Sequence, residues 1–231
     1  MGGAVVVLVV LAIIGQVVGV PEEEQIQVKP TSEEPSVQGM DDPTRAEDSV
    51  VLPLPETDKP EELAPKVAEV LGSADTARFT REQYVETIAS AAPEIPNEGK
   101  APTSPEQWAE QVVTTAWKSD PWEDRAKVKT TDTFTPQTVR TADEEEFLDF
   151  FAPESKKGTG EAREYLRDQG LVVMEVEGTL LRMVTNPEDG VRKQIDQGTQ
   201  SWTVAMLCGD GETCKVFLAL PGGLDEAREE G

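Results

Sequence analysis

The two cysteines are the side chains best placed for chemistry. Cys208 and Cys214 are the only cysteines in a chain of 231 residues. The segment between them, GDGET, contains two glycines and suits a hairpin loop that would bring the thiols together. A disulfide closing so small a ring would stabilise the fold by about 2 kcal/mol. We predict a Cys208–Cys214 disulfide in an exported domain, because disulfides persist outside the reducing cytosol. Two free core thiols are the alternative, and zinc would need further ligands.

Other polar clusters fit structural roles better than catalysis. The run DEEE (143–146) stands where a helix should begin, and acidic residues there interact favourably with the helix dipole. The turns 186–190 and 209–212 lack the ligand spacing of calcium loops, and KKGTGE (156–161) lacks the phosphate-loop pattern. The chain has no histidine, so the commonest general base is missing. We therefore predict a non-enzyme with no catalytic, cofactor-binding or metal-binding residues.

The overall charge limits the possible partners. The formal net charge is −24, and a surface this acidic repels nucleic-acid phosphates, so we expect no direct nucleic-acid binding. Hydrophobic residues make up 37% of a chain that also holds 17 prolines and 18 glycines. This mixture indicates a folded domain joined to a long disordered part.

The N-terminus carries a long apolar segment. Residues 2–20 contain no charge and one polar side chain, Gln16. As a helix this stretch would be roughly 28 Å long, close to the hydrocarbon thickness of a bilayer. We predict a transmembrane anchor over 1–20 in the cytoplasmic membrane. A cleaved signal peptide and a buried core helix are the alternatives. The acidic sequence that follows favours export of the bulk of the chain, as in a single-pass protein.

The next segment has the composition of a tether. Residues 21–57 are rich in proline and acidic residues, and the first aromatic residue of the chain is Phe79. Such a sequence cannot bury enough apolar surface to offset its ordering entropy. We predict a disordered acidic tether over 21–57, a folded domain over 58–222 and a disordered tail over 223–231.

Helical patterns dominate the first part of the predicted domain. A helix is expected within 60–72, with Gly72 as its stop, and two more begin at the capping pairs Thr80/Gln83 and Ser104/Gln107. Weaker patterns occur at 144–151 and 160–170. The tryptophans at helical spacing are more typical of a core than of a ligand site.

Strand patterns follow Gly170. The stretch 171–185 is rich in β-branched residues, 191–196 suits a short strand, and alternation in 200–208 and 214–221 predicts a hairpin joined through the cysteines. Helices first and antiparallel strands last indicate an α+β fold.

The order of these segments resembles one family. The chain carries the anchor and acidic tether, then the helices EELAPKVAEVLGSADT, YVETIASAAPE and PEQWAEQVVTTAW, and then the closing SWTVAMLCGDGETCKVFLALP. Together these segments are similar to membrane-anchored scaffold subunits of conjugative type IV secretion channels in Gram-positive bacteria, particularly actinobacteria. The resemblance spans about residues 60–221. It implies a cone-shaped domain of the nuclear-transport-factor-two-like, or cystatin-like, kind, with helices packed on a curved antiparallel sheet.

The resemblance also implies a function. It predicts a non-catalytic assembly protein that contacts other membrane subunits, with self-association among its expected contacts. The alternative is an anchored or secreted binding protein with a small-molecule pocket. An enzyme with a carboxylate base is a third class, for which the sequence offers no named residue.

Overall fold

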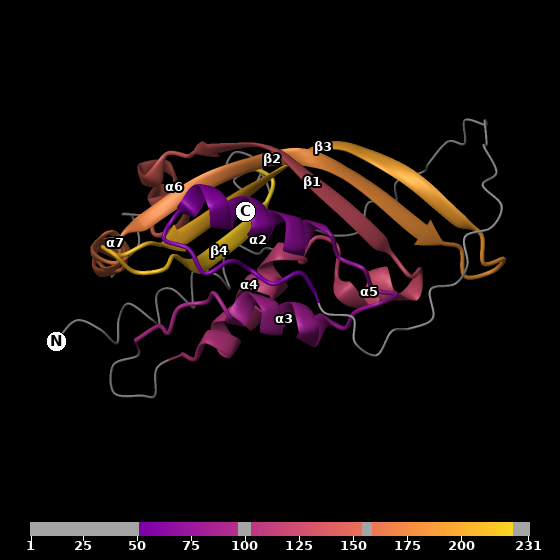
Figure 1. Cartoon of the computed structure of the whole chain (residues 1–231), viewed down its shortest axis with the longest axis horizontal. Coiled ribbons are helices and arrows are strands. Elements are labelled where there is room, and N and C mark those ends of the chain that lie inside the picture. The colour runs from indigo at the N-terminus through magenta and orange to yellow at the C-terminus, as the bar shows by residue number, and fades with distance from the viewer. Residues whose placement is uncertain (1–50, 97–102, 154–158, 224–231) are drawn as a thin grey trace.

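Helices and one antiparallel sheet make up the part of the chain that the structure describes (Figure 1). The computed structural model describes residues 51–96, 103–153 and 159–223. The helices are α2 (Pro60–Gly72), α3 (Arg81–Ala89), α4 (Pro105–Ala116), α5 (Trp122–Lys127), α6 (Glu144–Phe151) and α7 (Thr159–Asp168). The strands are β1 (Thr131–Thr141), β2 (Leu171–Thr185), β3 (Arg192–Leu207) and β4 (Lys215–Pro221), adjacent in that order. These six helices on a four-stranded antiparallel sheet confirm the α+β class.

The predicted anchor, most of the tether and nearly all of the tail lie outside the described residues. Among the three described ranges, no helix combines the length and apolar character needed to cross a bilayer. The tether prediction ran to residue 57, but Val51 and Leu54 are buried in the core. The segment Val51–Thr57, here called the strap, therefore packs on the domain, and the ordered structure includes residues before the predicted boundary at 58.

Local signals place the helix starts where the sequence predicted them. The Thr80 amide donates to Gln83 Oε1 at 2.8 Å. The Ser104 amide donates to Gln107 Oε1, and the Gln107 amide donates back to Ser104 Oγ. These are the reciprocal bonds of a capping box, which satisfy backbone donors that the first helical turn leaves unpaired.

Strand β1 corrects the predicted order of elements. The sequence placed all strands after residue 170, but β1 lies between α5 and α6 and pairs with β2. Pro136 interrupts its otherwise strand-like threonine pattern, and the register shifts between Pro136 and Thr138. Proline is tolerated at such an irregularity on an edge strand, where its missing N–H breaks no central ladder. The separate strands expected near 191–196 and 200–208 form the single strand β3.

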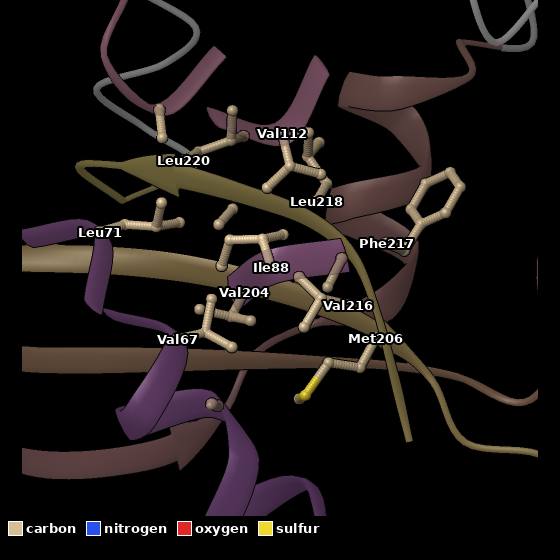
Figure 2. Close-up of a cluster of buried hydrophobic side chains, with 14 of the residues drawn as sticks. Val67, Leu71, Ile88, Val112, Val204, Met206, Val216, Phe217, Leu218 and Leu220 are labelled. Atoms are coloured by element: carbon tan, nitrogen blue, oxygen red, sulfur yellow. The ribbon is translucent and has the colours of Figure 1, made fainter. Parts of the chain in front are cut away.

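The main core lies between the sheet and helices α2, α3 and α4 (Figure 2). Apolar stripes on these helices meet the inward-facing side chains of β3 and β4. The cluster includes Val67, Leu71, Ile88, Val112, Val204, Met206, Val216, Phe217, Leu218 and Leu220. Burial of this surface is the main favourable term for folding.

One end of the sheet is covered on its other face as well. Val173 and Ala205 are paired neighbours that alternation directs away from Val204, yet they are 1% and 0% exposed. Helices α6 and α7 pack against β2 there. At the register shift between β3 and β4, Phe217 contacts Trp108 of α4 and Phe151 of α6, with ring centroids 5.1 and 5.3 Å away.

Two glycines make room for Phe134, which is 2% exposed. A Cβ atom on Gly72 would lie 2.7 Å from Phe134 Cβ, and one on Gly178 would lie 2.6 Å from the Phe134 ring. Gly72 thus allows close packing between α2 and the sheet in addition to ending the helix.

Candidate interaction surface

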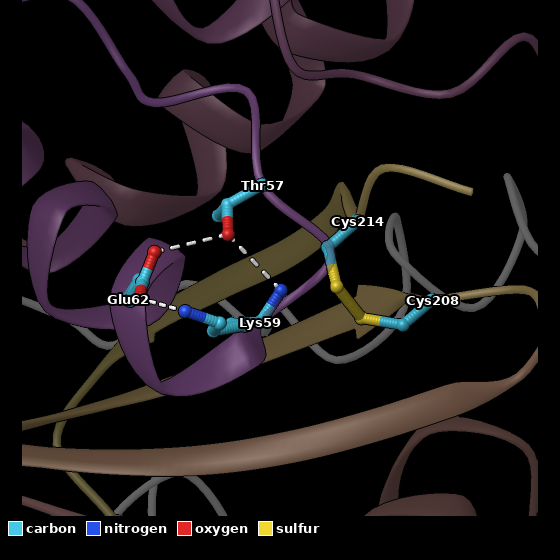
Figure 3. Close-up of a disulfide and its surroundings, with 5 residues drawn as sticks. All are labelled: Thr57, Lys59, Glu62, Cys208 and Cys214. Atoms are coloured by element: carbon cyan, nitrogen blue, oxygen red, sulfur yellow. Dashed lines mark hydrogen bonds and ion pairs between the residues drawn. A yellow bond between two sulfur atoms is a disulfide. The ribbon is translucent and has the colours of Figure 1, made fainter. Parts of the chain in front are cut away.

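The two cysteines form the predicted disulfide (Figure 3). Their Cα atoms lie 4.2 Å apart, directly after the last paired residues of the β3–β4 hairpin, Leu207 and Lys215. Cys214 is buried and Cys208 is partly buried against the core. The bond closes the hairpin covalently.

The backbone of Cys214 also forms a hydrogen bond with the strap. The Cys214 amide donates to the Thr57 carbonyl at 2.8 Å. The Thr57 hydroxyl in turn donates to Glu62 and accepts from the Lys59 amide, and Lys59 Nζ lies 2.7 Å from Glu62 Oε1 (Figure 3). This arrangement gives the cysteines a structural role where the chain enters the domain.

Four charged side chains meet beneath the far part of the sheet. Arg182 Nε and Nη2 donate to the two carboxylate oxygens of Asp132, each at 2.8 Å. Arg182 also pairs with Asp120 at 2.6 Å. Arg125 Nε pairs with Asp120 at 3.0 Å, and its buried Nη1 lies 3.4 Å from Asp132 without a hydrogen bond. We call these four residues the ionic cluster.

The ionic cluster is balanced and structural. Two carboxylates face two guanidinium groups, and the side chain of Asp132 is 1% exposed. The hydrogen bond with Asp132 raises the pKa of Arg182 above its ordinary value. Because both oxygens of Asp132 accept bonds from Arg182, this carboxylate is not free to act as a general base. The cluster ties the α5 region to β1 and β2, and the Thr185 amide adds a bond to the Val128 carbonyl.

Sequence reasoning missed the ionic cluster because its members are far apart in the chain. The one local signal was Arg182, which stands at an inward position within the apolar run LLRMV. An arginine on the inward face of a strand requires a carboxylate partner, but periodicity alone cannot identify that partner.

The acidic run at 143–146 starts α6, as predicted, and also joins α6 to α7. Asp143 accepts from the Glu146 amide as the helix cap. Arg163 of α7 is 5% exposed and pairs with both Glu145 and Asp149 at 2.7 Å. A hydrogen bond from Arg167 lowers the pKa of Glu145. These contacts assign the run to packing between helices.

The far half of the β2–β3 hairpin extends beyond the part of β3 that pairs with β4. We call Thr179–Thr185 of β2, the turn 186–191 and Arg192–Gln200 of β3 the arm. Strand β4 pairs with β3 only from Thr203 to Leu207, so in the arm β3 has β2 as its neighbour on one side. Residues 191–199 are all exposed. In Figure 1 the arm extends past α2 and α4.

Exposed apolar side chains gather on the arm. Val191, Leu181 and Ile195 are 56%, 39% and 37% exposed, and they are three of the five large hydrophobic residues exposed in the described part of the chain. By their register, Leu181 lies on the outer face of the arm and Ile195 on the face of the ionic cluster, so each face of the hairpin exposes an apolar side chain. Arg182 of the ionic cluster follows Leu181 in β2 and is paired with Ile195 across the hairpin. Side chains held in place before binding have a lower entropic cost of association.

The described ranges hold no group of three or more His, Cys, Asp or Glu side chains arranged to bind a metal ion. Comparison with known proteins finds no matching family model, no matching curated protein and no matching solved structure.

Proposed function

We propose that this protein is a non-catalytic assembly protein of a conjugative DNA-transfer apparatus, anchored in the cytoplasmic membrane with its domain outside the cell. The observation that carries the contact role is the arm, a hairpin with exposed apolar side chains whose β3 edge has no neighbouring strand among the described residues. The link to conjugation comes from the resemblance in segment order.

Three further features support this proposal. The polar clusters within the described ranges are engaged in internal pairs rather than converging on a reactive group. The apolar segment 2–20 is long enough to serve as an anchor. The disulfide weakly favours an oxidising location. The finer description of the fold that we propose is the cone-shaped, cystatin-like one.

Location can be tested independently of function. In a bacterial host the full chain should stay with membranes through alkaline carbonate washing. Release of a soluble chain beginning near Val20 would identify a signal peptide and contradict the anchor.

Function is tested by deleting the gene in a donor strain that carries the conjugative element. We expect the transfer frequency to fall and wild-type protein to restore it. The variant Ile195→Asp on the arm should restore transfer poorly, whereas Glu94→Lys, an exposed charge outside the arm, should restore it fully. Unchanged transfer after deletion would contradict the proposal, and a bound small molecule retained by the purified protein would favour the binding-protein alternative.

A further inference from the structure

The arm half of β3 is a sheet edge that the other described parts of the chain leave open. The edge of β4 is partly occupied, since Cys214 and Val216 donate their amides to the carbonyls of Thr57 and Ala91. At the start of β1, the Asp132 amide donates to the Ala74 carbonyl. The exposed segment 192–196 has no corresponding neighbour on its outer side among the described residues. An open edge is a template for a further strand.

The register with β2 fixes which side chains of this edge share a face. Arg192 is opposite Thr185 and Asp196 is opposite Leu181, whereas Lys193 and Ile195 are opposite Val184 and Arg182. Because side chains alternate along a strand, Arg192, Gln194 and Asp196 share the outer face, and Lys193 and Ile195 share the face of the ionic cluster.

The charges on this edge form no salt bridges within the described part of the chain. Neither Arg192 nor Lys193 forms an ion pair with another described residue, and Asp196 accepts a local bond from the Gly198 amide. Arg192 and Asp196 thus carry opposite charges on the same face, two residues either side of Gln194.

We propose that two copies of this chain pair along this edge, β3 against β3, antiparallel about a two-fold axis at Gln194. In this register each Arg192 lies opposite Asp196 of the second copy, and each Lys193 lies opposite Ile195. Opposite charges directly across antiparallel strands are favourable. The two four-stranded sheets then join into one of eight strands, and the lysine stem covers part of the exposed Ile195.

Neighbouring registers are less favourable. A two-fold axis at Lys193 places two ammonium groups opposite each other, and an axis at Asp196 places two carboxylates opposite each other. An axis at Ile195 brings no pair of opposite charges together. Beyond Asp196, Gly198 has a φ of +72° beside the register shift in β3, which limits the pairing to a short segment. This inference does not depend on the link to conjugation.

Cysteine cross-linking tests the pairing in the full-length protein. In Gln194→Cys the two new thiols lie opposite each other, within reach of a disulfide, so mild oxidation should give a covalent dimer on a non-reducing gel. The matched control is Thr199→Cys on the same exposed edge. In this register the two cysteines introduced at position 199 would lie about 30 Å apart and should not cross-link. Equal cross-linking of both variants, or none for Gln194→Cys, would overturn the proposal.

Charge exchange then tests the register within the Gln194→Cys background. Adding Arg192→Asp, or adding Asp196→Arg, should lower dimer yield by at least about ten-fold, because each change creates two like-charge contacts. Mixing the two variants in equal amounts should restore the yield, since every contact between unlike chains is again between opposite charges. Both sites are exposed, so thermal unfolding should be nearly unchanged. A mixture that fails to recover would refute this register.

Discussion

The two ends of the sheet are stabilised in different ways. At the near end, where β2, β3 and β4 lie side by side, apolar side chains are buried on both faces and a disulfide closes the hairpin. At the far end the arm has the ionic cluster on one face, and the outer edge of β3 has no neighbouring strand among the residues that the structure describes. The near end is thus held by apolar packing and a disulfide, whereas the arm is held to the rest of the domain by charge pairs.

This difference separates stability from recognition. Changes at the near end should alter the free energy of unfolding, because they remove buried contacts. Changes on the exposed edge of the arm should leave that free energy nearly unaltered and act on association instead. The ionic cluster lies between these extremes, since it is only partly buried and is made of charged groups.

The largest effect is expected for Phe217→Ala at the near end. Phe217 is 1% exposed and contacts aromatic rings of both helical layers. Its removal should lower the free energy of unfolding by about 4 kcal/mol. Denaturant unfolding measures this value, with Ile195→Ala on the arm as the control that changes little. Similar losses for the two variants would show that the ends are not energetically distinct.

A somewhat smaller loss is expected when the ionic cluster is opened. Asp132→Ala leaves the guanidinium groups of Arg182 and Arg125 without the more buried of their two shared carboxylates and should cost about 3 kcal/mol. Asp120→Ala is the matched control, because the side chain of Asp120 is 35% exposed and water can replace part of its role. The comparison fails if Asp120→Ala proves as destabilising as Asp132→Ala in the same urea titration.

The disulfide should contribute less than either buried group. Replacing Cys208 and Cys214 together with Ser should cost about 2 kcal/mol, because a ring this small restrains little of the unfolded chain. Without reductant, thiol titration should find no free cysteine. A loss well above this value would mean that the sulfurs contribute mainly through packing.

The smallest effect is an alkaline one at Tyr84, beside Trp117. Burial raises the pKa of Tyr84 to about 12. In the unfolded chain it titrates near its ordinary value of about 10, so the unfolded state loses this proton first. The contribution of Tyr84 to stability is therefore complete below pH 10 and is lost as the pH rises towards 12.

Because of this titration, the free energy of unfolding at pH 11 should be about 1 kcal/mol lower than at pH 9. Tyr84→Phe should show a flatter pH dependence in the same unfolding experiment. Equal slopes for the variant and the wild-type protein would contradict the assignment to Tyr84.

Short-range signals predicted much of the fold. The capping pairs Thr80/Gln83 and Ser104/Gln107 located two helices, and the GDGET loop located the hairpin and its disulfide. Strand β1 was missed because Pro136 obscures its alternation, and α5 has only six residues. The buried strap was missed because its prolines resemble those of the tether.

The candidate surface was harder to predict. The arm depends on how far β4 runs along β3, which no local pattern records. The ionic cluster joins residues as distant as Asp120 and Arg182. Such contacts arise from tertiary packing, and neither helix nor strand periodicity determines them.

The strap has a mechanical consequence. Tension applied to the chain before Val51 is resisted first by the buried side chains of Val51 and Leu54 and then at Thr57, whose carbonyl is bonded to the amide of Cys214. That amide belongs to a covalently closed hairpin, so the force is shared between two strands instead of peeling β4 away alone. If the protein is held at its N-terminus, these contacts would help the domain to resist unfolding under tension.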